Sequence, residues 1–521
     1  MQSAFDIAVV GSGFAGSLIA TIARRLGHSV VLLEKSKHPR FAIGESSTPL
    51  ANLILDELCE RYDLPGIRPL TKWGTWQRSH PEIACGLKRG FTFFHHEPGC
   101  VFGDDDAHRR QLLVAASPND RIADTHWYRP DFDAFLVAEA RKLGVEYLDE
   151  VDLWGVEVEQ KRPMFQGRHR GQPLEIHAEF IIDATGPRGF LHRALELPEV
   201  PFKNLPPTQA LYSHFVGVQS SGCSGSTLKP ELQPRPYPID DAAVHHVFDG
   251  GWIWVLRFNN RVTSAGVAAT SKFANEMRFA EGETAWKRLL EGFPSVRQQF
   301  ADAKATIPFI HAKQLSFLSG YVAGKNWVLL PSAAGIIDPL LSTGFPLTLL
   351  GVERLAWILE TKWGRADFAE ELFNYSMQTT IELVTTERLI AALYATMNDF
   401  ELFSALTLLY FAAASFTETA RRLGKPGLAG NTFLLGEHPV FGSRFRYCVD
   451  VALQKPAGAR RDELLQRIQQ TIEPVNVTGL GRPERRNWYP ALAGDLFAGA
   501  DKLHATRAEI EAMLKRCGFS S

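Results

Sequence analysis

Hydrophobic positions at the start of the chain follow a strand, helix, strand pattern. Residues 5–10 form an apolar, β-branched run, which predicts a buried strand. Residues 17–26 are rich in alanine, leucine and isoleucine and predict a helix, and residues 29–33 predict a second strand. A turn rich in glycine separates the first strand from the helix. Together these elements predict one βαβ unit.

The turn reads G-x-G-x-x-G from Gly11 to Gly16. Gly11 permits a tight turn, Gly13 lets a pyrophosphate approach the backbone, and Gly16 lets helix and strand pack closely. The free N–H groups and the positive dipole end of the helix suit phosphates. Glu34, which ends the second strand, suits the ribose hydroxyls of an adenosine. The unit therefore predicts bound FAD or NAD(P) and does not distinguish between them.

Further along, helical and strand patterns alternate. They predict helices at 52–62, 131–143 and 345–360, and strands within 86–96 and at 145–148, 175–183 and 327–330. The polar residues 98–122 predict an excursion from the fold. Alternation within 205–320 predicts antiparallel strands, and from about residue 365 the pattern is helical to the end. Residues 402–416 are apolar but too few for a bilayer, which predicts a buried helix.

These elements predict an α/β fold with three parts. The first is a Rossmann-like dinucleotide-binding domain built from residues 1–200 and 321–360. An antiparallel-sheet substrate domain, residues 201–320, is inserted into it. Residues 361–521 form a helical C-terminal region.

Composition narrows the function classes. Hydrophobic residues make up 45% of the chain and charged residues 22%, as in globular proteins. The formal net charge of −2 gives no general attraction to nucleic acid or to an anionic membrane. The six cysteines form no C-x-x-C, and no histidine cluster completes a zinc pattern, so no metal site is expected. We expect a cytoplasmic protein, because residues 1–6 lack the features of a signal peptide and the thiols suit a reducing compartment.

The order of these features resembles the FAD-dependent aromatic hydroxylase superfamily. The dinucleotide unit is followed by an R-x-x-x-D motif at Arg129 and Asp133, an A-T-G turn after a strand, the antiparallel region, and a D-P loop that opens a helix. The resemblance implies one FAD, so the Rossmann-like domain is an FAD-binding domain. It also implies a set of cofactor-binding residues: Gly11, Gly13, Phe14, Ala15, Gly16, Glu34, Arg40, Glu45, Arg129, Asp183, Asp338 and Gly344.

Four segments are similar, more narrowly, to flavin-dependent halogenases. Residues 38–49 contain a GE-x-x-x-P signature, and residues 83–91 match the segment that carries the halogenase lysine, here Lys88. Residues 251–260 resemble a W-x-W-x-I-P signature, and residues 338–344 resemble the loop that holds halide against the flavin. The best match is to halogenases of free phenolic substrates rather than of tryptophan.

This resemblance implies a chemistry and its partners. Reduced FAD and O2 form a flavin hydroperoxide, which chloride or bromide converts to hypohalous acid. Lys88 then delivers the halogen to a small phenolic or other electron-rich aromatic substrate, either through a hydrogen bond or as a haloamine. The N–H groups of Thr343 and Gly344, at a helix N-terminus, suit the halide. A separate NAD(P)H-dependent flavin reductase is implied, in secondary metabolite biosynthesis, and the enzyme is a monomer or a homodimer.

The chain departs from the family patterns at three places. Leu256 and Arg257 replace the I-P of the tryptophan signature. Leu341 stands where tryptophan halogenases have a glutamate that polarises the indole N–H, which a phenol does not need. A Pro-Ser pair at 331–332 replaces the G-D of the hydroxylases, as the phenolic halogenases permit.

Other interpretations stay open at this point. Lys88 sits beside Arg89 and could be a solvated lysine in a polar turn, and Lys72 is then the alternative. Trp252 and Trp254 alternate on a strand and could simply pack together. His95 and His96 are left outside the catalytic set. The alternative functions are an aromatic hydroxylase, which would consume NAD(P)H by itself, and a flavin-binding protein without turnover.

Overall fold

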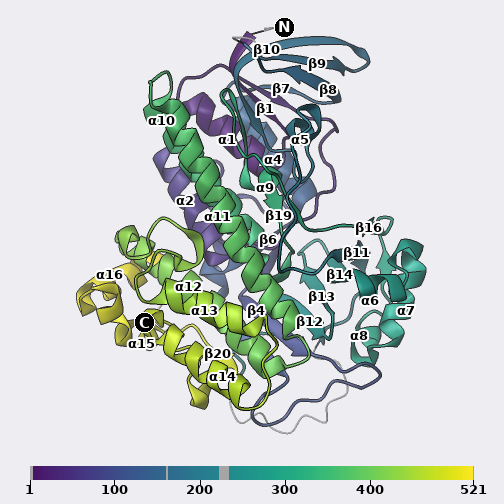
Figure 1. The fold of residues 1–521 in the computed structure, drawn as a ribbon, viewed down its shortest axis with the longest axis vertical. Coiled ribbons are helices and arrows are strands. Elements are labelled where there is room, and N and C mark those ends of the chain that lie inside the picture. The colour runs from purple at the N-terminus through teal and green to yellow at the C-terminus, as the bar shows by residue number, and fades with distance from the viewer. Residues whose placement is uncertain (1–3, 160–161, 222–233, 520–521) are drawn as a thin grey trace.

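The computed structural model describes residues 4–159, 162–221 and 234–519. The cysteine at position 223 and the first residues of the N-terminal segment lie outside these ranges. Two sheets and a set of long helices build the molecule. In Figure 1 the first sheet lies at the top, the second below it on the right, and the C-terminal helices below it on the left.

The first sheet has seven strands in the order β7-β2-β1-β10-β9-β8, with β18 beside β10. Strands β7, β2, β1, β10 and β18 are parallel, whereas β8, β9 and the start of β10 form an antiparallel meander. The bounds are β1 Ala4–Val10, β2 Val30–Leu33, β7 Glu146–Leu148, β8 Val151–Glu157, β9 Met164–His169, β10 Gln172–Asp183 and β18 Trp327–Leu329.

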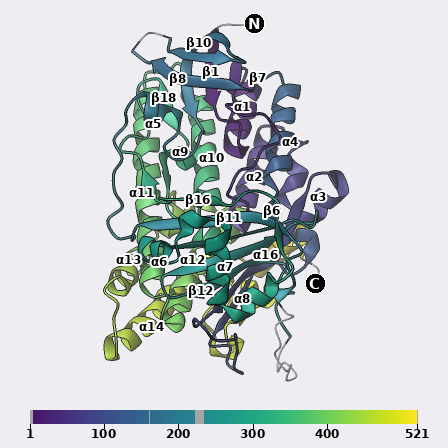
Figure 2. The same ribbon diagram turned by 90° about the vertical axis from the view of Figure 1, so that its right-hand side faces the viewer.

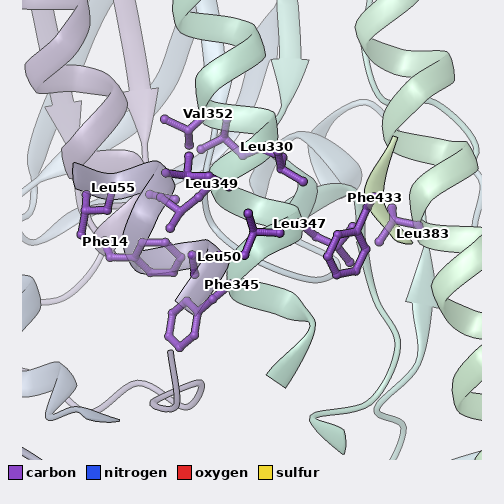
Figure 3. Close-up of a cluster of buried hydrophobic side chains, with 14 of the residues drawn as sticks. Phe14, Leu50, Leu55, Leu330, Phe345, Leu347, Leu349, Val352, Leu383 and Phe433 are labelled. Carbon is purple, nitrogen blue, oxygen red and sulfur yellow. The ribbon is translucent and has the colours of Figure 1, made fainter. Parts of the chain in front are cut away.

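Helices pack against the parallel strands and one another. Helix α10 crosses α1, α2 and α11, and α1 also contacts α4. Figure 3 shows the contact at the start of α10, where Phe345 lies beside Phe14 of α1 and Leu50 of α2. The bounds are α1 Phe14–Arg25, α2 Pro49–Arg61, α3 Trp73–Ser79, α4 Arg129–Lys142, α5 Phe190–Ala194, α9 Pro331–Ala334 and α10 Gly344–Lys362.

The second sheet has nine strands in the order β15-β11-β14-β13-β12-β4-β5-β20, with β16 beside β11. Its neighbours are antiparallel except β4 with β12 and β5 with β20, which are parallel. The bounds are β4 Gly90–His95, β5 Gln111–Ala115, β11 Thr208–Val216, β12 Ala243–Phe248, β13 Gly251–Arg257, β14 Thr263–Thr270, β15 Lys304–Ala305, β16 Ile310–Ala312 and β20 Trp488–Tyr489.

Different helices pack against the two faces of this sheet. Three short helices bury one face around Trp286, and they are α6 Ser271–Glu276, α7 Glu283–Glu291 and α8 Pro294–Gln299. Figure 2 shows these helices against the sheet. On the other face, Phe91 and Phe93 of β4 contact the ring of Phe411 in α12. Two small ribbons join the parts: β3 Cys85–Lys88 with β6 Asp124–Trp127, and β17 Phe317–Leu318 with β19 Gly335–Ile336.

The C-terminal region is mostly helical, as predicted. Its helices are α11 Phe368–Ala395, α12 Phe400–Arg422, α13 Phe441–Ala452, α14 Ala459–Ile472, α15 Ala493–Ala498 and α16 Arg507–Cys517. In the described part of the chain, α12 alone is long and apolar enough to cross a membrane by length and composition. It is longer than the predicted 402–416, but 72% of its apolar window is buried inside the structure. The prediction of a buried core helix is therefore confirmed.

The βαβ unit and the predicted helices and strands are present, and two regions differ from the prediction. Within the predicted excursion at 98–122, residues 111–115 form β5 inside the second sheet, because Leu112, Leu113 and Val114 are buried there. The C-terminal region is not helical throughout, since β20 adds an edge strand beside β5. The sheet of the predicted substrate domain, residues 201–320, thus also contains β4 and β5, which precede this range in the sequence, and β20, which follows it.

Candidate functional site

The glycine-rich turn joins β1 to α1 and lies against the turn after β10. Gly11 has φ of +96°, and a Cβ there would lie 2.8 Å from the carbonyl carbon of Ala184. A Cβ at Gly16 would lie 1.9 Å from the carbonyl oxygen of Gly11. These two glycines are therefore required by the close approach of backbone segments, as the sequence predicted.

Gly13 faces two cationic side chains. A Cβ at Gly13 would lie 3.3 Å from Nη2 of Arg129 and 4.0 Å from Nη2 of Arg40. Arg129 is held by a two-pronged ion pair with Asp133, at 2.8 and 2.7 Å, and by the carbonyl oxygen of Gly44 at 2.8 Å. Phe14 and Ala15 open α1, so their N–H groups lack helical partners. Glycine backbone, two guanidinium groups and a helix N-terminus together form an anion cradle that fits the pyrophosphate of a dinucleotide.

Glu34 lies at the end of β2 beside this cradle. Its Oε2 accepts hydrogen bonds from the backbone N–H and the Oγ of Ser12, at 3.0 and 2.8 Å, and pairs with Arg40 at 3.0 Å. Burial by itself raises the pKa of Glu34, but Arg40 and the hydrogen bonds from Ser36 and Ser12 outweigh burial and lower it. Glu34 is thus held as a carboxylate, the state that accepts hydrogen bonds from ribose hydroxyls.

Polar atoms without partners gather near Glu34. Among the described residues, buried Nε of Arg40 and Nδ1 of His38 make no hydrogen bond. Buried polar groups are normally satisfied. These two nitrogens therefore also fit a bound dinucleotide.

Glu45 forms a buried pair that the sequence did not indicate. Its Oε1 lies 2.7 Å from Nε2 of His214 in β11, and both side chains are almost fully buried. Its Oε2 has no partner within the described chain. Glu45 is therefore anchored across the junction between the two sheets with one oxygen still able to accept a hydrogen bond. No spacing pattern links positions 45 and 214, so only the fold could find this pair.

Asp183 is the last residue of β10, and its carboxylate accepts hydrogen bonds from the residues that follow it. Its Oδ1 accepts hydrogen bonds from the N–H and the hydroxyl of Thr185, at 2.8 and 2.5 Å, and its Oδ2 accepts one from the N–H of Leu191 at 2.6 Å. Burial raises its pKa. These bonds alone account for the buried carboxylate, so its contact with a cofactor stays a prediction.

The D-P loop is fixed by Asp338. Its Oδ1 accepts hydrogen bonds from the indole of Trp252 at 3.2 Å and from the N–H of Leu340 at 3.0 Å. Its Oδ2 accepts one from the hydroxyl of Tyr394 in α11 at 2.8 Å. Burial raises the pKa of Asp338 to about 6. The loop is thereby tied to the second sheet and to the C-terminal helices, and the role of Tyr394 was not predicted.

The residues after Asp338 lead into α10. Leu341 and Ser342 have φ of +65° and +55°, a conformation that costs free energy in residues other than glycine. Thr343 is the N-cap residue, and α10 starts at Gly344, one residue before the predicted helix at 345–360. A Cβ built on Gly344 meets no atom within 4 Å. The first turn of α10 therefore has open space beside Gly344.

Lys88 is buried, which excludes a solvated lysine in a polar turn. It is the last residue of β3, and its side chain has no exposed surface. Its Nζ donates hydrogen bonds to Oγ of Ser46 at 2.8 Å and to the carbonyl oxygen of Ser47 at 2.5 Å. The same atom lies 3.8 Å from the centre of the Phe91 ring. Lys88 therefore bridges the loop after β2 and the second sheet.

Asp124 stands directly opposite Lys88 in the β3–β6 ribbon. Burial lowers the pKa of Lys88, and Asp124 opposes that shift. Burial also raises the pKa of Asp124, and Glu418 adds to that effect. The two groups form a buried pair whose ionic form burial disfavours. Sequence reasoning missed Asp124, because its partner lies on another strand.

Lys72, unlike Lys88, is not fully buried. It is partly exposed and caps the start of α3, and it lines a pocket of 140 Å³ between the second sheet and the C-terminal helices. Phe91 and Asp124 line the same pocket.

His95 stacks on Phe400, whereas His96 pairs with His246 at 2.9 Å. These contacts are structural, and both histidines stay outside the proposed catalytic set.

Comparison with known proteins identifies related chains. The family model described as tryptophan halogenase matches residues 125–401, and an NAD(P)-binding Rossmann-like domain matches residues 9–55. Monodechloroaminopyrrolnitrin halogenase PrnC of Pseudomonas fluorescens is 29% identical over 77% of this chain and 70% of its own length. Tetracycline 7-halogenase of Kitasatospora aureofaciens is 27% identical over 71% of this chain and 66% of its own. The chain thus spans about two thirds of these curated relatives.

Solved structures show the same fold. The structure of halogenase PltM with phloroglucinol and FAD has a TM-score of 0.82 and 23% identity, over 92% of this chain and 99% of that one. Flavin-dependent brominase Bmp2 has a TM-score of 0.62 and 18% identity, over 87% of this chain and 100% of that one. These structures confirm the predicted fold class, whereas the family model and the curated relatives confirm the resemblance to flavin-dependent halogenases.

Proposed function

Because the chain belongs to the tryptophan halogenase family, we propose that it is an FADH2-dependent halogenase of a small phenolic substrate, in which Lys88 delivers the halogen. The observation that carries the proposal is the position of Lys88. This buried amine touches both the loop after β2, on the dinucleotide side, and Phe91, which lines the pocket. A group that passes halogen from the flavin to a substrate must stand between the two.

Each site residue then has a role. The cradle around Gly13, with Arg40 and Arg129, holds the pyrophosphate of FAD, and Glu34 holds its adenosine ribose. Bound FAD, once reduced, supplies hypohalous acid from O2 and chloride or bromide. The N–H groups at the start of α10, at Thr343 and Gly344, bind the halide. The buried carboxylate of Glu45 and its partner His214 stand at the junction of the two sheets.

Lys88 has the chemistry for delivery. An ammonium has three donors, and Ser46 and Ser47 use two of them, which leaves one for hypohalous acid. Burial lowers the pKa of Lys88, so more of it is free amine near neutral pH than in a solvated lysine. The amine can attack hypohalous acid to give a haloamine and water. Both delivery routes are therefore available to this one group.

A phenol fits the D-P loop better than an indole does. Leu341, fully buried, occupies the position where tryptophan halogenases carry a glutamate for the indole N–H. A phenol needs no such acid, because its own hydroxyl activates the ring. The related PltM structure holds phloroglucinol, a phenol. We also propose the predicted division into three parts, with β4, β5 and β20 added to the sheet of the substrate domain, and a cytoplasmic location.

The loop at residues 338–344, which is proposed to hold the halide, is positioned in part by Trp252, and this can be tested. Replacing Trp252 with phenylalanine removes the donor to Asp338, which should cost about 1 kcal/mol of stability and loosen the loop. We expect the KM for halide to rise several-fold, with FAD content unchanged. Steady-state kinetics against chloride or bromide measure this effect.

Trp254→Phe is the matched control for this variant. Trp254 lies two residues away on the same strand, is equally buried, and donates to Oγ of Ser264 instead of the loop. An equal rise in halide KM in both variants would mean that Trp252 acts only through packing of the sheet.

The source of electrons separates a halogenase from a hydroxylase. The chain has one G-x-G-x-x-G, and FAD occupies it in this proposal. We therefore expect bound FAD to stay oxidised with NADH or NADPH alone and to bleach when a flavin reductase is added. Absorbance of the flavin under anaerobic conditions measures this. Rapid bleaching without the reductase would favour the hydroxylase.

A further inference from the structure

The pocket beside Lys88 has a defined shape and lining. It measures 140 Å³ and lies between the second sheet and α12. It is lined by Phe91 of β4 and Val114 of β5 and by Tyr410 and Phe411 of α12. The rings of Phe91 and Phe411 are in contact, with their centres 5.0 Å apart, so they form one continuous apolar surface. A flat ring can pack against such a surface.

Its volume limits the ligand to about one ring. An apolar cavity of about 150 Å³ in another protein binds benzene. Pockets for drug-sized ligands usually exceed about 300 Å³. A monocyclic aromatic compound therefore matches this pocket better than a polycyclic one.

Asp124 supplies a carboxylate at the pocket wall. It is 7% exposed, and its Oδ1 accepts a hydrogen bond from Nδ2 of Asn52 at 2.8 Å. No hydrogen bond reaches its Oδ2 from the described parts of the chain. Lys88 faces it across the β3–β6 ribbon. Oδ2 of Asp124 can thus accept a hydrogen bond from a ligand, and it lies next to Lys88, the proposed halogen donor.

Resting on the proposed function, we propose that Asp124 is a second catalytic residue, which accepts the hydroxyl proton of a monocyclic phenol bound in this pocket against Phe91 and Phe411. Electrophilic attack is faster on a phenolate than on a phenol, because the oxygen anion donates more charge to the ring. Burial raises the pKa of Asp124, which makes it a stronger base than a solvated aspartate. Lys88 delivers the electrophile while Asp124 activates the ring that receives it.

The proposed step balances as follows. The phenolic O–H gives its proton to Asp124 while a ring carbon forms its bond to the halogen of hypohalous acid. The O–halogen bond breaks and hydroxide leaves. The ring carbon loses its proton to this hydroxide, which gives water and restores aromaticity. Asp124 then returns its proton to the phenolic oxygen, so one phenol and one hypohalous acid yield one halophenol and one water.

The test compares a phenol with its methyl ether, which lacks the acidic proton. Phloroglucinol and its trimethyl ether, together with phenol and anisole, are titrated into the FAD-loaded protein, and binding is measured by calorimetry without turnover. In wild type we expect each phenol to bind about tenfold or more tightly than its ether, as for a hydrogen bond to a charged group. In Asp124→Asn this ratio should fall several-fold, because an amide oxygen accepts a weaker hydrogen bond than a carboxylate does. Equal ratios in wild type and variant would overturn the proposal.

Turnover gives a second readout that a purely structural defect would not reproduce. We expect Asp124→Asn to lower halogenation of phenol at least about 100-fold. The loss should be much smaller with a nitrophenol that is already ionised at the assay pH, because no base is then needed. A uniform loss over all phenols would contradict the role of Asp124. Asp124→Ser, which has a smaller side chain, serves if the asparagine variant does not fold.

Failure of this inference can be told from failure of the proposed function. If wild type forms halophenols but Asp124→Asn does so equally well, only the role of Asp124 is lost. If wild type forms no halogenated product, the proposed function itself is lost. The binding ratios remain interpretable in either case.

Discussion

Lys88→Ala is expected to abolish halogenated product while FAD binding, O2 consumption and peroxide release stay normal. The amine is needed only after hypohalous acid has formed, so the earlier steps do not depend on it. Removing it eliminates both the hydrogen-bonded and the haloamine route. We expect product per O2 consumed to fall about 100- to 10,000-fold, the range for a lost positioned proton-transfer group. Mass spectrometry with parallel oxygen-electrode measurement gives this ratio.

Two further lysine variants make this result specific. Lys88→Arg should not rescue halogenation, because a guanidinium is planar, remains charged and forms haloamines poorly. Lys72→Ala should retain halogen delivery, with at most a change in the KM for the phenol, because Lys72 lines the pocket but does not bridge the two sides of the site. Normal halogenation by Lys88→Ala together with a dead Lys72→Ala would show that the wrong lysine has been assigned.

Removal of the buried amine also affects Asp124. Without Lys88 the hydrogen bonds to Ser46 and Ser47 are lost and Asp124 loses a neighbouring charge, so a stability loss of about 1–3 kcal/mol is expected. Thermal unfolding must therefore accompany the kinetics. Only a folded Lys88→Ala with normal flavin content isolates the delivery step.

Gly13→Val is expected to abolish retention of FAD. A Cβ at this position would already lie 3.3 Å from Nη2 of Arg129, and the branches of valine would fill the pyrophosphate cradle. The flavin absorbance of the purified protein, scaled to protein concentration, measures the effect. A folded Gly13→Val with wild-type flavin content would contradict the cradle.

Gly427→Val is the control for the general effect of replacing a glycine with valine. Gly427 is exposed, and a Cβ there meets no atom within 4 Å. It should bind FAD normally. Circular dichroism of both variants then distinguishes loss of the cradle from loss of the fold.

The dinucleotide half of the site could be predicted because its signals are local. Gly11, Gly13 and Gly16 lie in one short segment, and the geometry of a βαβ unit assigns each a task. The structure shows the tight approaches at Gly11 and Gly16 directly. The start of α10 at Gly344 was also predictable, because the D-P loop and the apolar helix that follows it are contiguous.

The partners across the fold could not be predicted. His214 reaches Glu45, Tyr394 reaches Asp338, and Asp124 faces Lys88, each from a distant part of the chain. Local sequence around Lys88 is polar and suggests a surface turn, whereas two strands and a loop bury it completely. Pairings of this kind depend on topology rather than on periodicity.

The same limit explains the missed strands. Residues of β5 are apolar for only a few positions and are flanked by charged residues, so the stretch resembles a loop. The two residues of β20 are too few to show alternation, and they are strand only because β5 offers them an edge. Both assignments need the three-dimensional sheet.

The most direct test of the central claim is mass spectrometry of the products formed from monocyclic phenols. The protein is supplied with reduced FAD, O2 and either chloride or bromide, and phenols are compared with indoles and pyrroles of similar size. The account predicts a halophenol, marked by the isotope pattern of chlorine or bromine, which depends on added halide and disappears in Lys88→Ala. Formation of hydroxylated phenols without halogen, or halogenation that persists undiminished without Lys88, would contradict it.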